Sequence, residues 1–477
     1  MKKVVITLII GIVIGISLTT LSSVLRNPKQ PRNAPTRTVQ ETVHPKPETV
    51  HAKTPAELEN LPKGAIVFDL SYAGLTDGRY GSYWGFGRSR NNNDSSFIKE
   101  VRKKAGEIQV IENRYFPEAR LSAVEMLDNK AQALYFDLDQ NGKLSDNEKI
   151  LPLTPKPEDN SSTVDFMTPD FDLKTQEGRT VRFRTLARVS HRGSDGNVNI
   201  DVMWSPACIL QGSASIDGEP ARLTLFTNGF NGRFDRFGRG RYSLVKEKDY
   251  ELEMALRSRQ TLSSLINYNG RFYRLKILGS NEKGKVVKAA LVEDTSPRGT
   301  VALNIEGDNT LKTKLERATI NGKSDKTIYF NISGGQTELP EGDYVLSRGQ
   351  FKYRVGKARG WKVDFSRGPE FVITPDKETV ITMGKPAMSI RAVDNNKRYN
   401  SDVKPQKSFT KGARIYIEPT IKGMAGEVYG RFTEWKQRTN KKTGELEDKW
   451  RWSDSAPHIV IVDPGGKEFV SKKMEYG

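Results

Sequence analysis

Apolar and polar residues alternate in short runs from Gly64 onward, and Gly, Asn and Asp separate these runs. Alternation with a period of two is typical of strands with one buried face, and the separating residues favour turns. The pattern therefore predicts a mainly β protein. The expected strands lie at 65–68, 107–112, 120–126, 131–136, 180–189, 198–204, 221–226 and 270–278, and one helix is expected at 95–106, between a serine cap and Gly106.

Changes in this pattern divide the chain, whose 477 residues exceed what one hydrophobic core supports. We expect a small α+β domain and tandem β-sandwich units behind an N-terminal membrane helix and a Pro-rich stalk. The expected segments are a membrane segment at 1–25, a Pro/Thr-rich linker at 26–62, the α+β domain at 63–177, a β domain at 178–295, a β-sandwich at 296–385 and an immunoglobulin-like β-sandwich at 386–477. Asn-Gly pairs at 231–232 and 269–270 lie between aromatic residues and predict two-residue hairpin turns.

The N-terminus carries two lysines followed by an uncharged run from Val4 to Leu25. At about 1.5 Å per residue, this run is long enough to cross a hydrocarbon core of about 30 Å as a helix. It predicts a transmembrane signal anchor, and a cleaved signal peptide is the alternative. Both interpretations place the bulk of the chain on the exported side of a membrane: at the cell envelope, in the periplasm or outside the cell, or secreted after cleavage.

The formal net charge of +18 is unevenly distributed. Residues 64–177 hold 14 Lys and Arg against 19 Asp and Glu, whereas residues 178–477 hold 53 against 35. For an exported protein, the basic part favours an anionic polysaccharide or another envelope component as partner, and no nucleic acid. A solvated basic surface without a partner is the alternative.

Cysteine and histidine usage restricts the chemistry. Cys208 is the single cysteine, so no intrachain disulfide can form. With four histidines in the whole chain, a zinc site of the Cys/His type is not expected. We expect Cys208 to be a small buried side chain.

One segment, DLDQNGKLSDNE from Asp137 to Glu148, has the spacing of oxygen ligands that Ca²⁺ requires. Its ligands are expected at positions 1, 3, 5, 7, 9 and 12 of the loop, and Gly142 is expected to take the sharp turn at position 6. These ligands are Asp137, Asp139, Asn141, the backbone carbonyl of Lys143, Ser145 directly or through water, and Glu148.

Over these twelve residues the chain resembles the EF-hand loop, in the form of a single hand of exported bacterial type. The run before the loop reads as a strand, so we expect a strand, the loop and a short helix over 146–150. The resemblance implies that Ca²⁺ acts as a structural brace for the domain at 63–177. An Asp/Asn-rich turn without metal is the alternative.

A second cluster combines tryptophans with cations on both sides of a polar segment at 439–448. It predicts a long hairpin. Its aromatic faces and charges are candidate contacts for a polyanion or glycan, and cross-strand packing is the alternative. The residues are Trp435, Lys436, Arg438, Lys449, Trp450, Arg451 and Trp452.

No motif for nucleophilic, phosphoryl or zinc-dependent catalysis occurs in the chain, so an enzyme is the less favoured class. The sequence predicts an exported, membrane-anchored, calcium-binding structural or binding protein of the cell envelope. A secreted or envelope glycan-acting hydrolase with unrecognised carboxylates is the alternative. The ligand, the physiological role, the oligomeric state and the completeness of the C-terminus remain open.

Overall fold

The structure is a computed structural model of the chain. It describes Val4–Val5 and residues 61–473, except for 76–84, 89–106, 114–115, 117–119, 128–129, 154–162, 175–179, 193–198, 228, 281–285, 307–311, 333–334, 356–358, 385–386, 395–407, 410–413, 440–445, 452–457 and 463–467. Several expected features lie outside the described residues. They are the expected membrane segment apart from Val4–Val5, the expected linker up to residue 60, the helix expected at 95–106, and Trp452.

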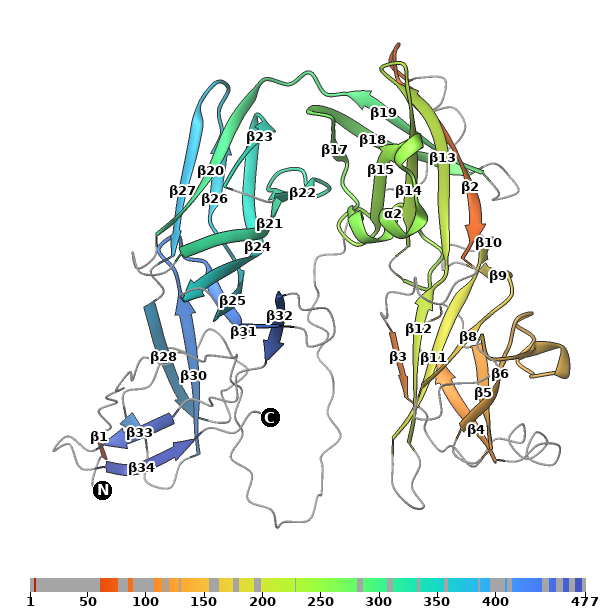
Figure 1. Cartoon of the computed structure of the whole chain (residues 1–477), viewed down its shortest axis with the longest axis horizontal. Coiled ribbons are helices and arrows are strands. Elements are labelled where there is room, and N and C mark those ends of the chain that lie inside the picture. Colours follow the sequence, from red (N-terminus) through yellow and green to blue (C-terminus); the bar gives the residue numbers. More distant parts are fainter. Residues whose placement is uncertain are drawn as a thin grey trace. The chain divides into compact units, whose positions relative to one another are not determined.

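The chain divides into two compact units (Figure 1). The N-terminal unit lies within Glu48–Thr295 and includes Thr327–Tyr329. The C-terminal unit lies within Ser296–Lys326 and Phe330–Gly477 and includes the described part of Met1–Pro47. Both are built almost entirely of strands, as the alternating pattern predicts. Among the described residues, no helix is long and apolar enough to cross a membrane.

The N-terminal unit contains one large sheet and three smaller ones. The large sheet has the order β16 (Gln260–Thr261), β15 (Arg241–Lys246), β14 (Glu219–Phe226), β13 (Cys208–Ile216), β2 (Ile66–Gly74), β19 (Val286–Glu293), β18 (Arg271–Ser280) and β17 (Leu265–Tyr268). The smaller sheets are β3 (Gly85–Arg88), β12 (Asn199–Pro206), β11 (Thr185–Arg192) and β8 (Thr163–Met167); β4 (Glu107–Asn113), β5 (Arg120–Leu127), β6 (Lys130–Phe136) and β7 (Lys149–Ile150); and β9 (Phe171–Lys174) with β10 (Thr180–Phe183).

Strands on both sides of the boundary expected at 177/178 share these sheets. β2 lies between β13 and β19, and β8 pairs with β11. A single buried cluster contains Phe68, Phe136 and Trp204 together. Residues on both sides of the expected 177/178 boundary therefore share one hydrophobic cluster.

The two expected Asn-Gly hairpins have different outcomes. Asn269 and Gly270 have φ values of 52° and 82° and connect β17 to β18, which confirms the tight turn. The hairpin expected at 231–232 is wrong, because a long loop over 227–240 connects β14 to β15. Phe230 and Phe234, which flank the Asn-Gly pair, are buried in the core. Their burial favours this long loop over a two-residue turn.

One α-helix lies in the region expected to be purely β. It is α2 (Leu252–Ser258), which packs on the sheet through the buried Ala255 and contacts β15. Two 3₁₀ turns are also described, η3 (Asp146–Glu148) and η4 (Glu247–Asp249).

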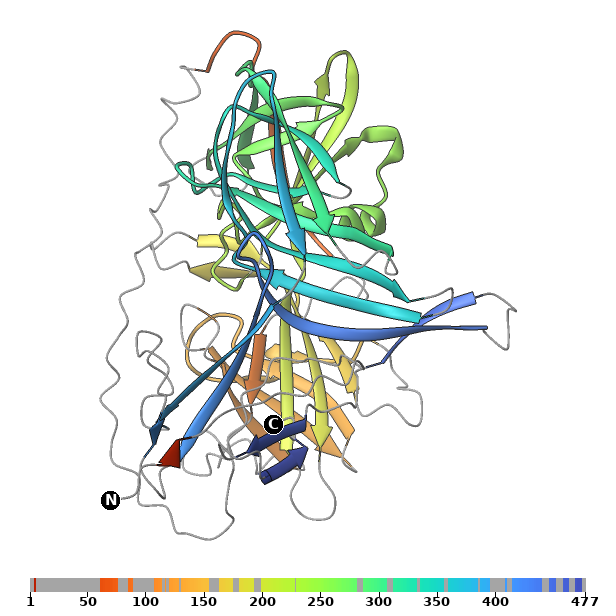
Figure 2. The same ribbon diagram turned by 90° about the vertical axis from the view of Figure 1, so that its left-hand side faces the viewer.

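The C-terminal unit contains a three-stranded sheet and a nine-stranded one. The three-stranded sheet has the order β23 (Gln336–Pro340), β20 (Arg298–Glu306) and β27 (Glu378–Gly384). The nine-stranded sheet runs β22 (Tyr329–Ile332), β21 (Lys312–Gly322), β24 (Gly342–Val355), β25 (Arg359–Ser366), β31 (Val428–Thr439), β30 (Ile415–Lys422) and β28 (Ala387–Asp394), with β26 (Glu370–Ile373) on β24 and β32 (Leu446–Arg451) on β31. Its long strands, drawn cyan to blue, are bent and twisted in Figure 2.

Two further strand pairs are described in this unit. They are β33 (His458–Val462) with β34 (Glu468–Lys473), and β1 (Val4–Val5) with β29 (Ser408–Phe409). The boundary expected at 385/386 is crossed by the pairing of β25 with β31. The immunoglobulin-like class of residues 386–477 stays a prediction.

Candidate metal site

The Asp137–Glu148 loop begins at the end of a core strand. β6 ends at the fully buried Phe136, whose ring centroid lies 5.1 Å from that of Trp204 and 5.4 Å from that of Phe171. The next backbone amide, that of Asp137, donates a hydrogen bond to the carbonyl of Leu121 at 3.0 Å. The expected strand before the loop is confirmed, and core packing fixes the position of Asp137.

The loop ends in one 3₁₀ turn, η3, followed at once by β7. Lys149 lies opposite Tyr135 and Ile150 opposite Leu134, so the chain returns to pair with β6. The helix expected over 146–150 is therefore confirmed only as a 3₁₀ turn over 146–148, because burial of Ile150 through strand pairing requires an extended backbone at 149–150. The return to β6 brings the two ends of the loop together.

Three carboxylates converge inside the loop. One oxygen each of Asp137, Asp139 and Glu148 can be chosen so that all three lie within 4.8 Å of one another. Asp137 and Glu148 are 1% and 5% exposed, and Asp139 is exposed. The site is therefore buried on the side of Asp137 and Glu148 and open to solvent on the side of Asp139.

Backbone amides of the loop orient these carboxylates. Gly142 donates to Asp137 Oδ2 at 3.3 Å, and Asn141 donates to Asp139 Oδ1 at 3.0 Å. Glu148 is held at both oxygens, since Leu138 N donates to Oε1 at 2.6 Å and Ser145 N to Oε2 at 3.0 Å. The three acids are therefore fixed by the fold of the loop.

Two residues with positive φ make the sharp turn. Gln140 has φ 62° and Gly142 has φ 74°. A Cβ on Gly142 would meet no atom within 4 Å, so the glycine serves the backbone conformation, and no close contact requires it. The turn expected at position 6 is present.

The other three predicted ligands lie in the same loop with defined contacts. Asn141 Oδ1 accepts a hydrogen bond from Lys143 N at 2.7 Å, and Asn141 Nδ2 donates to Asp139 Oδ2 at 2.7 Å. Ser145 Oγ donates to Glu148 Oε2 at 3.1 Å. An amide oxygen that accepts one hydrogen bond keeps a second lone pair for a cation. The direction of the Lys143 carbonyl stays a prediction.

The electrostatics of this arrangement favour a cation. Within the described chain, the hydrogen-bond donors to Glu148 are neutral N–H and O–H groups of Leu138 and Ser145. Carboxylates that are buried close together repel one another more strongly than they would in water. A hard divalent cation with six to eight oxygen ligands would offset this repulsion.

Strands β31 and β32 form the hairpin expected around 439–448, and all residues of the predicted tryptophan cluster except Trp452 lie on these two strands. β31 pairs with β32 in a register that puts Trp435 opposite Trp450 and Lys436 opposite Lys449. Arg438 pairs with Glu447, and Arg451 with Glu434.

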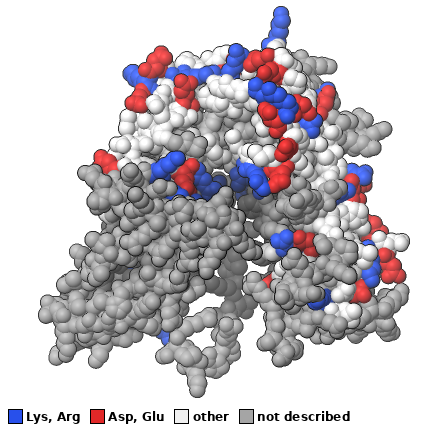
Figure 3. Space-filling model, in the orientation of Figure 1, with Lys and Arg blue, Asp and Glu red and all other residues white. Residues whose placement is uncertain are grey.

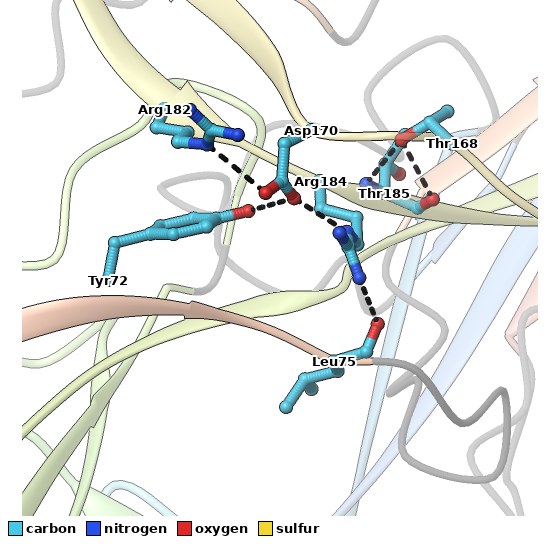
Figure 4. A network of polar contacts seen from close by, with 7 residues as sticks. All are labelled: Tyr72, Leu75, Thr168, Asp170, Arg182, Arg184 and Thr185. Carbon is cyan, nitrogen blue, oxygen red and sulfur yellow. Dashed lines mark hydrogen bonds and ion pairs between the residues drawn. The ribbon is translucent and has the colours of Figure 1, made fainter.

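Sequence reasoning missed a second polar network, in which Asp170 accepts hydrogen bonds from three side chains (Figure 4). Tyr72 Oη donates to Oδ1 at 2.7 Å, Arg184 Nε to Oδ1 at 2.6 Å and Arg182 Nε to Oδ2 at 3.1 Å. Arg184 also donates to the carbonyl of Leu75 at 3.1 Å. The network thereby connects β2 to the β9–β10 ribbon.

Burial and charge shift the titration of this network. Burial alone would raise the pKa of Asp170, but hydrogen bonds from Tyr72 and Arg182 and the charge of Arg184 outweigh it and lower that pKa. Burial, with the nearby Cys208 and Asp170, raises the pKa of Tyr72 well above its usual value. Cys208 is buried, as expected, and its burial raises the thiol pKa to about 12. The network therefore links β2 to the β9–β10 ribbon through a charged carboxylate.

Comparison of the chain with protein-family models, curated proteins and solved structures gave no match. Any functional proposal for this chain therefore rests on its own residues and their geometry.

Proposed function

We propose that the chain is a calcium-binding structural or binding protein in which one Ca²⁺ occupies the Asp137–Glu148 loop and braces the N-terminal unit. The observation that carries this proposal is the convergence of Asp137, Asp139 and Glu148 within 4.8 Å. These acids stand at positions 1, 3 and 12 of a twelve-residue loop, with glycine at position 6. Both the order of residue types and the contacts of the loop support Ca²⁺.

The roles of the ligands follow from their chemistry. The three carboxylates supply the charge that offsets the dehydration of the ion, with Glu148 able to bind through both oxygens. The Asn141 amide oxygen, the Lys143 carbonyl and Ser145 would complete a set of at least six oxygens. Because the loop joins β6 to its partner β7, the ion would hold two adjacent strands in register.

The cell envelope is the proposed location, with the chain exported and anchored by its N-terminus. The support is the sequence itself: two lysines, then 22 uncharged residues, then a Pro/Thr-rich linker. At extracellular calcium levels, loops with dissociation constants of about 10⁻⁴ to 10⁻³ M stay largely loaded. Such a site acts as a permanent brace.

The decisive test is the melting temperature of the protein with calcium and with chelator. With 10 mM calcium and a dissociation constant of about 10⁻⁴ M, binding adds about 2.7 kcal/mol to the stability of the loaded unit. That corresponds to an increase in Tm of about 5 to 10 °C for a unit of this size. Equal melting curves in calcium and in chelator would overturn the proposal.

Variants of the loop show where the ion binds. Glu148→Gln should abolish the calcium-dependent increase in Tm. Asp139→Asn should reduce it while leaving the metal-free protein folded, since Asp139 is exposed. Asp146→Asn is the matched control, because Asp146 is an exposed acid of the same loop outside the converging set, and the wild-type response should persist.

A further inference from the structure

On the face drawn in Figure 3, basic and acidic side chains of the described residues are interspersed, so they mark no surface of a single charge there. The Asp137–Glu148 loop, in contrast, has a second chemical feature besides its carboxylates. It contains Asn141-Gly142, one of five Asn-Gly pairs in the chain, and the others begin at residues 228, 231, 269 and 321. In such a pair the backbone nitrogen readily attacks the side-chain amide, because glycine has no Cβ to obstruct the approach.

This reaction converts the asparagine into an acid and consumes one water. The glycine nitrogen loses its proton and forms a bond to Cγ of the asparagine, while the bond from Cγ to Nδ2 breaks and Nδ2 leaves with that proton as ammonia. The product is a succinimide ring. Water then opens the ring at one of its two carbonyls and gives either aspartate or isoaspartate, in which the backbone runs through the side-chain carbons.

The loop gives the reacting atoms of this pair suitable neighbours. Gly142 N donates a hydrogen bond to Asp137 Oδ2 at 3.3 Å, so a carboxylate lies where the proton of the attacking nitrogen must leave. Asn141 Oδ1 accepts a hydrogen bond from Lys143 N at 2.7 Å, and this N–H can stabilise the negative charge that develops on the oxygen during attack. Asn141 and Gly142 are both exposed, so water can reach the ring.

Three other Asn-Gly pairs have different surroundings. The glycine of the 231–232 pair is buried. Gly270 N donates a hydrogen bond to the neutral amide oxygen of Asn267 at 3.2 Å. The pair at 321–322 lies within β21 and is held in register with β24. Burial, an amide acceptor and strand pairing hold these three pairs in turn, so we expect Asn141 to react before them.

We propose that Asn141 is a self-modification site, at which Asp137 takes the proton of Gly142 N and promotes conversion to aspartate and isoaspartate. Isoaspartate adds a carbon to the backbone between positions 5 and 6 of the loop, which disturbs the convergence of its acids. A bound calcium ion would restrain Asn141 and Asp137 as its ligands and slow the reaction. That protection rests on the proposed function, whereas the chemistry of the pair does not. Loss of calcium would then lead to permanent alteration of the loop.

The test incubates the full-length protein in chelator at physiological temperature and pH and follows each Asn-Gly pair by peptide mass spectrometry. Deamidation raises the mass of the peptide, and enzymatic methylation of isoaspartate identifies the isomer. A parallel incubation in guanidinium chloride gives the rate of each pair in the unfolded chain. Asn141 should react faster in the folded protein than in the unfolded chain, and the 231–232 pair more slowly. A folded-state rate of Asn141 at or below its unfolded-state rate would overturn the proposal.

Asp137→Asn tests the role of the carboxylate in the same incubation. It should slow conversion of Asn141 about ten-fold or more, because a positioned base contributes about 10²-fold or more to a proton transfer. Asp146→Asn is the matched control, since Asp146 is an exposed acid of the same loop, and it should leave the rate unchanged. Slow reaction of the 231–232 pair shows that a variant is folded. Equal rates of Asn141 in the two folded variants would overturn the proposal, and the comparison of folded with unfolded wild type decides if Asp137→Asn does not fold.

Added calcium separates this inference from the proposed function. Calcium should slow conversion of Asn141 in the wild-type protein and leave the rate of the 269–270 pair unchanged. If calcium raised the Tm but did not slow Asn141, protection by the ion would be overturned while the calcium site stood. If calcium left the Tm unchanged, the calcium site would be overturned, and the rates in chelator would still decide whether Asn141 modifies itself.

Discussion

Arg184 lies across the backbone of Gly74, so closely that a Cβ on Gly74 would come within 2.6 Å of the guanidinium carbon. Gly74 is the last residue of β2, and it pairs with Cys208 of β13. The absence of a side chain at this position allows the arginine to reach Asp170 and the Leu75 carbonyl at the same time. A glycine therefore determines the geometry of an ionic network about one hundred residues away in the chain.

Gly74→Ala should destabilise the N-terminal unit by about 1 to 3 kcal/mol, because the methyl group displaces a partly buried arginine from its partners. Urea denaturation followed by tryptophan fluorescence measures the loss. Gly229→Ala is the matched control in the same unit, since a Cβ there would meet its nearest atom at 3.9 Å. Similar denaturation midpoints for the two variants would show that Arg184 moves at little cost.

Asp170→Asn should cost about 2 to 3 kcal/mol at neutral pH, since it removes a charged acceptor of three hydrogen bonds. The pKa of Asp170 is lowered in the folded protein, so its contribution is complete above the unfolded value of about 3.9 and is lost as pH falls through the lower folded value. The difference between wild type and variant should therefore shrink below about pH 4.

Asp217→Asn provides the comparison for Asp170. Asp217 forms an exposed ion pair with Arg271 at 3.0 Å, and its change should cost at most about 1 kcal/mol. A wild-type advantage over Asp170→Asn that stays constant from pH 7 to pH 2 would contradict the assigned direction of the pKa shift.

The contrast between this network and the Asp137–Glu148 loop shows which features of the structure can be predicted from sequence. The loop is local: its ligands, its glycine and the strand before it lie within about twenty residues, so a fixed spacing of residue types marks it in the sequence. Asp170 and Tyr72 are 98 residues apart and meet only through the packing of β2 against the β9–β10 ribbon. No pattern of residue types in one sequence specifies such a pairing.

Tertiary packing also explains the two places where the local sequence prediction differs from the structure. Residues 231–232 carry a strong hairpin signal, but burial of the flanking Phe230 and Phe234 gives a longer loop. The run 146–150 has residues that favour a helix, yet the pairing of Ile150 with Leu134 gives its end an extended backbone. In both places the burial of one or two large side chains outweighs a preference of a few tenths of a kcal/mol.

Gly142→Ala should weaken the calcium loop through the backbone alone. The residue has φ 74° and open space around it, so an alanine there meets no atom but takes a conformation that costs about 1 to 2 kcal/mol. We expect calcium affinity to fall about ten-fold by calorimetric titration. Gly142→Asn should lose less, because asparagine tolerates this conformation better. An alanine variant with wild-type affinity would show that the turn relaxes freely.

Glu427 is a carboxylate buried in the C-terminal unit. It accepts hydrogen bonds from Gly384 N at 2.9 Å, Ala425 N at 3.0 Å and Tyr429 Oη at 2.8 Å. These bonds join the end of β27 to the turn between β30 and β31. Burial raises the pKa of Tyr429, as do Tyr353 and Glu427 itself, so its hydroxyl keeps the proton that it donates.

Glu427→Gln keeps the shape of the side chain but replaces one of its two accepting oxygens with an NH₂ group, which then faces the backbone N–H of either Gly384 or Ala425. It should therefore cost about 3 kcal/mol in urea denaturation, whereas Tyr429→Phe, which removes one of three donors, should cost about 1 kcal/mol. The difference between the two variants separates the carboxylate from the packing around it. If Glu427→Gln were no more destabilising than Tyr429→Phe, the amides of Gly384 and Ala425 would have to find other acceptors, and the turn would not depend on the charge.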